Sequence, residues 1–234
     1  MIPIGDNLPR RSHPIVTYGL IGLSVGLFLW ELQLGSPALN DFLQTWGVVP
    51  ARIAALSQDA IAGQWLALPL LVASLVASLF LHQGFAQLLG NLLFFRVFGA
   101  QVEATLGHGA FLAFFVMAGI MTSSLQVLIN PTLQAPFIGA NGAIAAVLGA
   151  YLVGFPKAKI DSILPLVVVF VPLELPVWVY LFWWFIQQAT YGLDSFTIPS
   201  GINPSGWSYW TQAIGLLLGA AGMKFRLMNI RTSG

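Results

Sequence analysis

Charged side chains and cysteine are what this sequence has least of. Only 7% of its 234 residues are charged and none is cysteine, whereas 57% are hydrophobic. A soluble domain carries about 25% charged residues, so this chain has too few charges to cover a surface in water. The lack of cysteine excludes disulfides, thiolate metal sites and cysteine nucleophiles. The net charge of +1 gives no indication of nucleic-acid binding.

The apolar residues form long unbroken runs. A helix needs about 20 apolar residues to cross a bilayer, whereas the strands of a membrane barrel alternate apolar and polar residues. The runs therefore predict an all-α membrane protein, a bundle of six transmembrane helices with a partly embedded loop between the first and the second. The expected helices cover about residues 14–34, 78–98, 110–128, 141–155 and 207–223, and the fifth of the six lies within about 163–188. Pro165, Pro172 and Pro176 disturb the start of the fifth.

One membrane domain accounts for the whole chain, since no repeat or low-complexity tract divides it. We expect residues 1–13 to form an N-terminal cytoplasmic segment, residues 14–223 the six-helix core and residues 224–234 a cytoplasmic tail. The apolar stretch 65–99 is too long for one span. We assign its first part, about 65–77, to an interfacial or re-entrant piece that is a candidate contact surface for a partner.

The basic residues support six spans and set the expected orientation. Eight of the nine fall on one side of the six-span arrangement, and Arg52 alone falls on the other. Basic residues are enriched in cytoplasmic loops, so both termini are expected in the cytoplasm. The expected location is a bacterial inner (plasma) membrane or an internal photosynthetic membrane.

Four segments in the same order carry a family resemblance. They are LHQGFAQLLGN at 81–91, VFGAQVEATLGH at 97–108, IGANGAIAAVLGAY at 138–151 and WTQAIGLLLG at 210–219. Together they resemble the rhomboid family of intramembrane serine proteases. These segments are similar to the family's helix-two run, which usually ends in His-x-x-x-Asn, to its loop after helix two, to the Gly-x-Ser-Gly start of its helix four and to its final helix. The resemblance implies a six-helix rhomboid-like bundle.

The catalytic residues of that family are the part that does not match. Rhomboids use a serine nucleophile in helix four and a histidine base in helix six, and a histidine and an asparagine in helix two hold the oxyanion. Here Asn141, Gln212 and Gln87 stand at the first three positions, and Asn91 matches the fourth. A carboxamide has no hydroxyl and no proton acceptor near neutral pH, and a lone oxyanion donor cannot start the reaction. We therefore expect no catalytic residue and no enzyme activity.

The four amides are expected to converge in the helix bundle. A buried amide without a partner costs about 1–3 kcal/mol, and mutual hydrogen bonds would remove most of that cost. The first hypothesis is a structural network of Asn141, Gln212, Gln87 and Asn91. The alternative is that these amides line a water-filled cavity.

Glycines mark the expected contact between the fourth and the last helix. Gly215 and Gly219 form a small-residue packing motif, and the resemblance implies that it packs on helix four. Gly139 and Gly142 flank Asn141, which suits a close approach of the backbone.

Four tryptophans, Trp183, Trp184, Trp207 and Trp210, are expected to bracket the outer ends of helices five and six. Tryptophan favours the membrane interface. In rhomboids this side forms the lateral gate for substrate helices, so an aromatic partner gate and plain anchoring both fit.

Two polar pairs are further candidates. Ser78 and His82 are four residues apart and would share a helix face, either as a substitute nucleophile and base or as an ordinary helix start. His82 and His108 would lie at opposite ends of helix two, so they cannot share a metal, although one histidine can ligate a pigment.

Three charged residues complete the candidates. Glu174 falls near the start of helix five, as an interfacial acid or as a functional intramembrane acid. Arg96 and Glu103 are expected at the cytoplasmic headgroup level.

Three functions follow from these observations. The first is a non-catalytic rhomboid-like protein, a pseudoprotease that binds transmembrane helices of partners as an assembly factor or accessory subunit of a membrane complex. The second is an active rhomboid endopeptidase with a non-standard site. The third is a transporter or a pigment-binding protein. Transporters usually show paired charges or broken helices at matching positions of two halves, and this sequence shows no such pair. No cofactor, metal or nucleic acid is expected, and the expected partners are the lipid bilayer and transmembrane helices.

Overall fold

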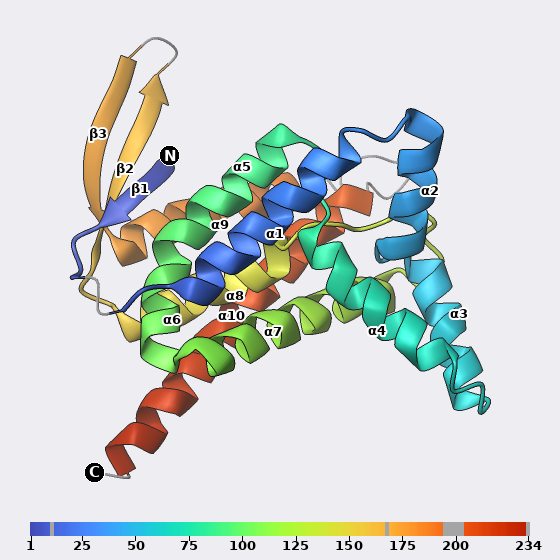
Figure 1. Cartoon of the computed structure of the whole chain (residues 1–234). Helices are drawn as coiled ribbons and strands as arrows, with labels where there is room; N and C mark the ends of the chain where they lie inside the picture. The colour runs from blue at the N-terminus through green and yellow to red at the C-terminus, as the bar shows by residue number, and fades with distance from the viewer. Residues whose placement is uncertain (10–11, 167–168, 194–203, 233–234) are drawn as a thin grey trace.

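The computed structural model describes residues 1–9, 12–166, 169–193 and 204–232. The chain is mostly helical, with one small sheet (Figure 1). The helices are α1 (Ile15–Glu31), α2 (Ser36–Trp46), α3 (Pro50–Ile61), α4 (Ala67–Ala77), α5 (Phe85–Phe94), α6 (Ala100–Leu106), α7 (His108–Ile129), α8 (Asn141–Gly154), α9 (Val177–Leu193) and α10 (Pro204–Thr232). The strands are β1 (Ile2–Asp6), β2 (Lys159–Leu166) and β3 (Val169–Pro176).

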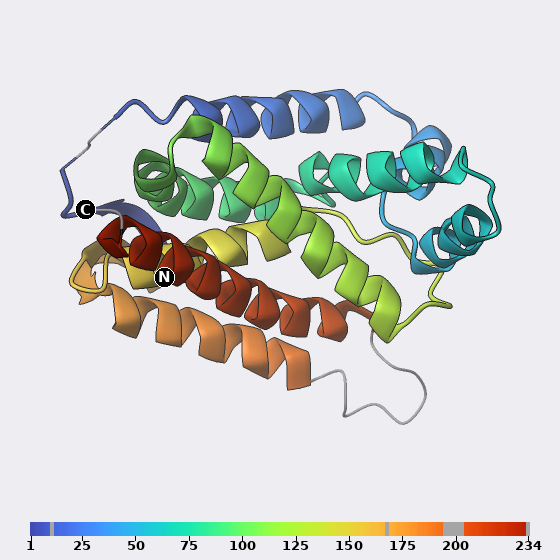
Figure 2. The same ribbon diagram turned by 90° about the horizontal axis from the view of Figure 1, so that it is seen from below.

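Helix α8 is the centre of the bundle. Every residue from Ala143 to Tyr151 is buried, and α5, α6, α7, α9 and α10 all contact this helix. Figure 2 shows α9 and α10 running along one side of the bundle and α1 along the other, with α7 crossing between them. Small side chains in α8 make this central position possible, because they let neighbouring helices approach closely.

The closest approach joins α8 to α10. A Cβ added at Gly215 would lie 2.5 Å from the Gly142 carbonyl oxygen, and one at Gly219 would clash with the Ala146 carbonyl. In the opposite direction, a Cβ added at Gly149 of α8 would clash with the Leu216 carbonyl of α10. The two backbones therefore touch at three places over about two turns, and only glycine fits at these positions.

Two expected helices lie close to where the sequence placed them. The prediction for 110–128 corresponds to α7 (His108–Ile129), and the prediction for 141–155 corresponds to α8. Helix Phe85–Leu106, formed by α5, a π-helical turn (Phe95–Gly99) and α6, and helix α7 have 22 residues each and are long and apolar enough to cross a membrane. The helices Ile15–Glu31 and Asn141–Gly154 are apolar but shorter. Six spans therefore stay a prediction.

The second expected helix begins at Phe85, so the start predicted at residue 78 is wrong. Residues Ser78–Phe80 form a 3-10 turn that continues α4, and Leu81 then adopts an extended conformation. The earlier part of the stretch forms α4, close to the piece predicted at 65–77. Helices α2, α3 and α4 stand together at one end of the molecule in Figure 1. Arg52 of α3 joins α3 to α4 by donating to Ser74 Oγ at 2.6 Å.

The fold is mostly helical, as expected, but the start of helix five predicted within 163–188 is wrong, because residues 159–166 and 169–176 pair there as two strands. Strands β2 and β3 pair antiparallel from Lys159↔Pro176 onward, and β1 joins the other edge of β2 to give the order β1-β2-β3. Proline has no backbone N–H and breaks a helix interior, whereas the β-branched residues between Pro165 and Pro172 favour a strand. Helix α9 therefore starts only at Val177, directly after Pro176.

Both ends of the chain also differ from expectation. Residues 2–6, expected in a cytoplasmic segment, form β1 and pair with β2, from Ile2↔Ile163 to Asp6↔Ile160. The last helix does not end at residue 223 but continues to Thr232. Residues 224–232 of the expected tail are therefore helical, and Figure 1 shows them projecting beyond the other helices.

Candidate functional site

A polar cavity of about 480 Å³ opens among α5, α7, α8 and α10. Its walls come from the start of α5, the C-terminal half of α7, the segment before α8 and the first turns of α10. The lining residues are Ser78, Leu79, Gln83, Gln87, Thr122, Ser123, Gln126, Ala135, Pro136, Phe137, Ile138, Gly139, Asn141, Gly142, Tyr209 and Gln212. Gln87, Asn141 and Gln212, from three different helices, thus converge on one space.

A neighbouring cavity of about 360 Å³ shares Gln87, Asn141, Tyr209 and Gln212 with the first and adds Asn91. All four amides named from the sequence therefore lie at these two cavities. In the described part of the chain, no histidine, lysine, arginine or carboxylate lines either cavity. The site offers uncharged donors and acceptors.

The amides do not form the network that was the first hypothesis. Gln87 Nε2 donates to the Ile138 carbonyl at 3.0 Å, and Gln87 Oε1 accepts from the Gln83 backbone N–H at 2.8 Å. Asn91 Nδ2 lies 3.3 Å from His82 Nε2. Within the described residues, no hydrogen bond joins one of the four amides to another. The alternative, amides lining a cavity large enough for water, describes the structure.

The turn before α8 depends on glycine. Gly139 has φ +103°, where side chains are rarely tolerated, and its N–H donates to the Ser78 carbonyl at 2.8 Å. A Cβ at Gly139 would clash with Gln87 Nε2, and one at Gly142 would clash with Thr122 Oγ1. These two glycines leave the space in which Asn141 begins α8 next to the polar cavity.

Ser78 and His82 do not form a substitute catalytic pair. Ser78 belongs to the 3-10 turn and His82 to the break before α5, so they share no helix face. Ser78 Oγ donates to the Leu75 carbonyl at 3.0 Å. His82 Nδ1 lies 3.0 Å from the Phe80 carbonyl and Nε2 faces Asn91.

Both ring nitrogens of His82 face hydrogen-bond partners, and burial disfavours a charge on the ring. Burial lowers its pKa, against a smaller opposing effect of the Phe80 carbonyl. A neutral ring donates from one nitrogen and accepts at the other, which matches Phe80 and Asn91. No ring nitrogen remains for a pigment.

The tryptophans only partly occupy the predicted places. Trp183 and Trp184 lie in the middle of α9 and not at its outer end, because α9 starts at Val177. Trp183 is 48% exposed, whereas Trp184 lines the second cavity. Trp210 lies in the second turn of α10 and is partly buried. The side chain of Trp207 lies outside the described residues.

Glu103 is fully buried inside the bundle, and its depth at the level of the headgroups stays a prediction. Its carboxylate accepts from the backbone N–H groups of Val16 and Thr17, from Thr17 Oγ1 and from His108 Nδ1. It therefore holds the first turn of α1 against α6 and α7. The sequence analysis missed this role, although a single acid in an apolar helix is itself a signal of a specific partner.

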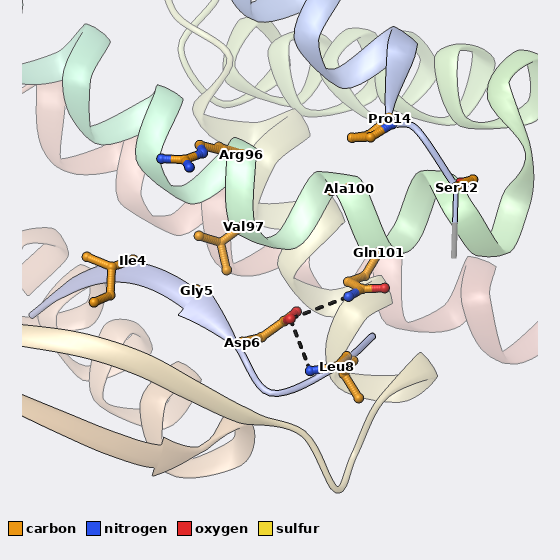
Figure 3. Close-up of a pocket in the computed structure, with 10 residues that line it drawn as sticks. All are labelled: Ile4, Gly5, Asp6, Leu8, Ser12, Pro14, Arg96, Val97, Ala100 and Gln101. Carbon is orange, nitrogen blue, oxygen red and sulfur yellow. Dashed lines mark hydrogen bonds between the residues drawn. The ribbon is translucent and has the colours of Figure 1, made fainter. Parts of the chain in front are cut away.

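The two other charged candidates lie at the surface. Glu174 is on β3, not on a helix, and forms a half-exposed ion pair with Lys159 at 3.2 Å. Arg96 is exposed and lines a small cavity of about 120 Å³ beneath β1 (Figure 3).

Comparison with known proteins places this geometry in a family. The model of the rhomboid domain matches residues 70–228, which contain both cavities. The chain is 30% identical over 156 residues to "Rhomboid protein 1, mitochondrial" of Saccharomyces cerevisiae, covering 64% of this chain and 40% of that protein. It is 32% identical over 144 residues to "Rhomboid protease GluP" of Bacillus subtilis, covering 61% and 25%. The chain thus spans less than half the length of these two relatives.

The domain match covers well over half of the chain, and the segments that carry the sequence resemblance lie within it. Rhomboids are integral membrane proteins, which agrees with the two long apolar helices. The chain belongs to the rhomboid family.

Proposed function

We propose that this protein is a non-catalytic rhomboid-like protein that binds transmembrane helices of partner proteins, as an assembly factor or accessory subunit of a membrane complex. The observation that carries the proposal is the pair Asn141 and Gln212 at one cavity. By resemblance, these positions belong to the nucleophile and the base of the family.

The chemistry of the cavity supports the absence of catalysis. Acyl transfer needs a nucleophile and a base within hydrogen-bonding reach of each other. Ser78, Thr122 and Ser123 line the larger cavity, but no histidine or carboxylate of the described residues lines it with them. The hydroxyls of Ser78 and Thr122 already donate to backbone carbonyls. An uncharged, amide-rich site instead suits hydrogen bonding to an exposed peptide backbone.

Helix α9 offers a surface for a partner helix beside this site. Trp178, Phe182 and Trp183 are exposed on it, and Trp184 lines the second cavity. In a membrane, helices associate through packing and occasional polar contacts. A partner helix lying on α9 would thus have the amides within reach.

A second candidate function is an active rhomboid protease with a non-standard site. It is favoured by the similarity to the Bacillus relative, which is named a rhomboid protease. The two functions differ in whether any hydroxyl of this chain is activated.

A serine-directed fluorophosphonate probe tests this difference. The purified protein should remain unlabelled, because no base activates its hydroxyls. The double variant Asn141→Ser/Gln212→His restores the family's residues at both positions and should become labelled, provided that its thermal transition in detergent matches the parent's. Labelling of the parent protein would refute the non-catalytic proposal.

Partner binding is tested by photo-crosslinking in native membranes. A benzophenone amino acid placed at Trp183 should yield protein crosslinks in several-fold excess over the same group at Met117. Both side chains are about half exposed, but Met117 lies on α7. Equal yields at the two positions would contradict a partner surface on α9.

The basic residues support an orientation with both termini in the cytoplasm. Lys224 and Arg226 lie on the projecting end of α10 (Figure 1), and Arg96 lies in the π-helical turn between α5 and α6. Basic residues favour the cytoplasmic side. The proposed location of the protein is a bacterial plasma membrane or an internal photosynthetic membrane.

A further inference from the structure

The hairpin of β2 and β3 has its charges only at its base. Lys159, Asp161 and Glu174 lie in the pairs next to the bundle, where Lys159↔Pro176 and Asp161↔Glu174 are partners. From residue 162 to residue 173 the sequence SILPLVVVFVPL has no charged side chain. One end of this hairpin is therefore polar and the other entirely uncharged.

The base is firmly attached to the bundle. Asp6 of β1 accepts from Tyr151 Oη of α8 at 2.7 Å and from Gln101 Nε2 of α6 at 3.4 Å, and Figure 3 shows the contact with Gln101. The Val177 N–H, at the start of α9, donates to the Ala158 carbonyl at 2.9 Å. The position of the hairpin relative to the helices is thus fixed from both sides.

Among the residues that the structure describes, no hydrogen bond joins the uncharged end of the hairpin to the helices. The pairing of β1 with β2 ends at Ile163, and beyond it the hairpin is a two-stranded ribbon that stands off the helices in Figure 1. Phe170 is 65% exposed and Pro172 is also exposed. A two-stranded hairpin is marginally stable in water, and an exposed apolar one is prone to aggregate. This end therefore needs an apolar environment.

The edge of β3 argues against a peptide strand as that environment. β3 is an outer strand of the sheet, and it contains Pro172 and Pro176. Proline lacks the N–H that an added strand would need, so prolines at an edge block strand addition. The missing N–H groups also leave fewer backbone donors without a partner when this edge lies in a medium of low polarity.

We propose that the uncharged end of this hairpin inserts its apolar side chains into the lipid interface, at the boundary of headgroups and acyl chains. The hairpin continues without a linker into α9, where Trp178 and Phe182 are exposed. Lys159 and Glu174 then lie at the headgroups, where charges are well hydrated. Interfacial elements of this kind bury apolar side chains while their polar groups stay in contact with water. The inference is independent of the proposed function.

Single-cysteine labelling tests the depth of the hairpin, and the chain has no native cysteine to interfere. Phe170→Cys and Glu174→Cys lie on the same face of β3, about 13 Å apart along the strand. Each variant carries a nitroxide in vesicles of phosphatidylcholine and phosphatidylglycerol at a low protein-to-lipid ratio. The measured quantity is the relative accessibility to oxygen, which concentrates in lipid, and to a water-soluble nickel complex.

The ratio of oxygen to nickel accessibility should be several-fold higher at residue 170 than at residue 174, and close to that of a lipid-facing label at Met117→Cys. Pro172→Cys, between them on the same face, provides a second position if Phe170→Cys shifts the thermal transition. Equal nickel accessibility at 170 and 174 would place the hairpin in water and overturn the proposal. Dipolar broadening at 170, with protection from both reagents, would overturn it in favour of contact with a second copy.

Discussion

Replacing Glu103 with glutamine should lower the free energy of unfolding by about 2–4 kcal/mol, since two of the four donors on this carboxylate lose their acceptor together. The carboxylate accepts from Thr17 N at 2.7 Å, Thr17 Oγ1 at 2.6 Å and Val16 N at 2.9 Å. First-turn N–H groups have no partner within their own helix, and a carboxylate also suits the positive end of the helix dipole. Glutamine would turn an NH₂ group toward these donors.

The matched control is Glu174→Gln. Glu174 is half exposed and pairs with Lys159 on the hairpin, and an exposed ion pair contributes less than about 1 kcal/mol. The measurement is the unfolding midpoint of both variants in the same detergent micelles. If Glu103→Gln and Glu174→Gln shifted the midpoint equally, Glu103 would not hold α1 in place.

Replacing Gly219 with alanine should destabilise the fold by about 3 kcal/mol or more, at the upper end of what overpacking costs. The added methyl would clash with the backbone of Ala146, and backbone cannot rotate away as a side chain can. Helix α10 would therefore have to move off α8 along its whole length. Loss of folded protein in detergent, measured by thermal unfolding and by yield of the monodisperse species, checks this.

Gly222→Ala is the comparison, three residues further along the same helix. The nearest atom to its added Cβ is in the Phe114 ring at 3.5 Å, an ordinary contact. Alanine is a better helix former than glycine by about 0.5–1 kcal/mol, so this variant should be unchanged or slightly more stable. Comparable losses for Gly219→Ala and Gly222→Ala would mean that glycine serves flexibility and not close packing.

The helices that the sequence predicted well are those with clear ends. Helix α7 lies between Gly107, with φ +83°, and Asn130-Pro131, and α8 ends just before Pro156. Glycine and proline stop helices for local reasons. The run 163–188 was assigned to one helix because hydrophobicity alone does not separate a strand from a span. The prolines and β-branched residues in its first half carried the correct signal.

The site was predictable in position but not in bonding. Resemblance to rhomboids was enough to bring Asn141, Gln212, Gln87 and Asn91 together. Their hydrogen bonds depend on the position of the Ile138 carbonyl, which is set by the backbone turn at Gly139. No sequence pattern gives that position. The contact between Glu103 and Thr17 joins two distant segments in the same way, so it becomes visible only in three dimensions.

The pairing of β1 with β2 sets an order of events during synthesis. Residues 2–6 leave the ribosome before their partners at 160–163, which follow only after α1 to α8 have been made. Domains form as their chains emerge, and contacts between distant segments form late. Strand β1 therefore stays unpaired until β2 has been made. Its pairing with β2 can occur only after the central helix α8 has been synthesised.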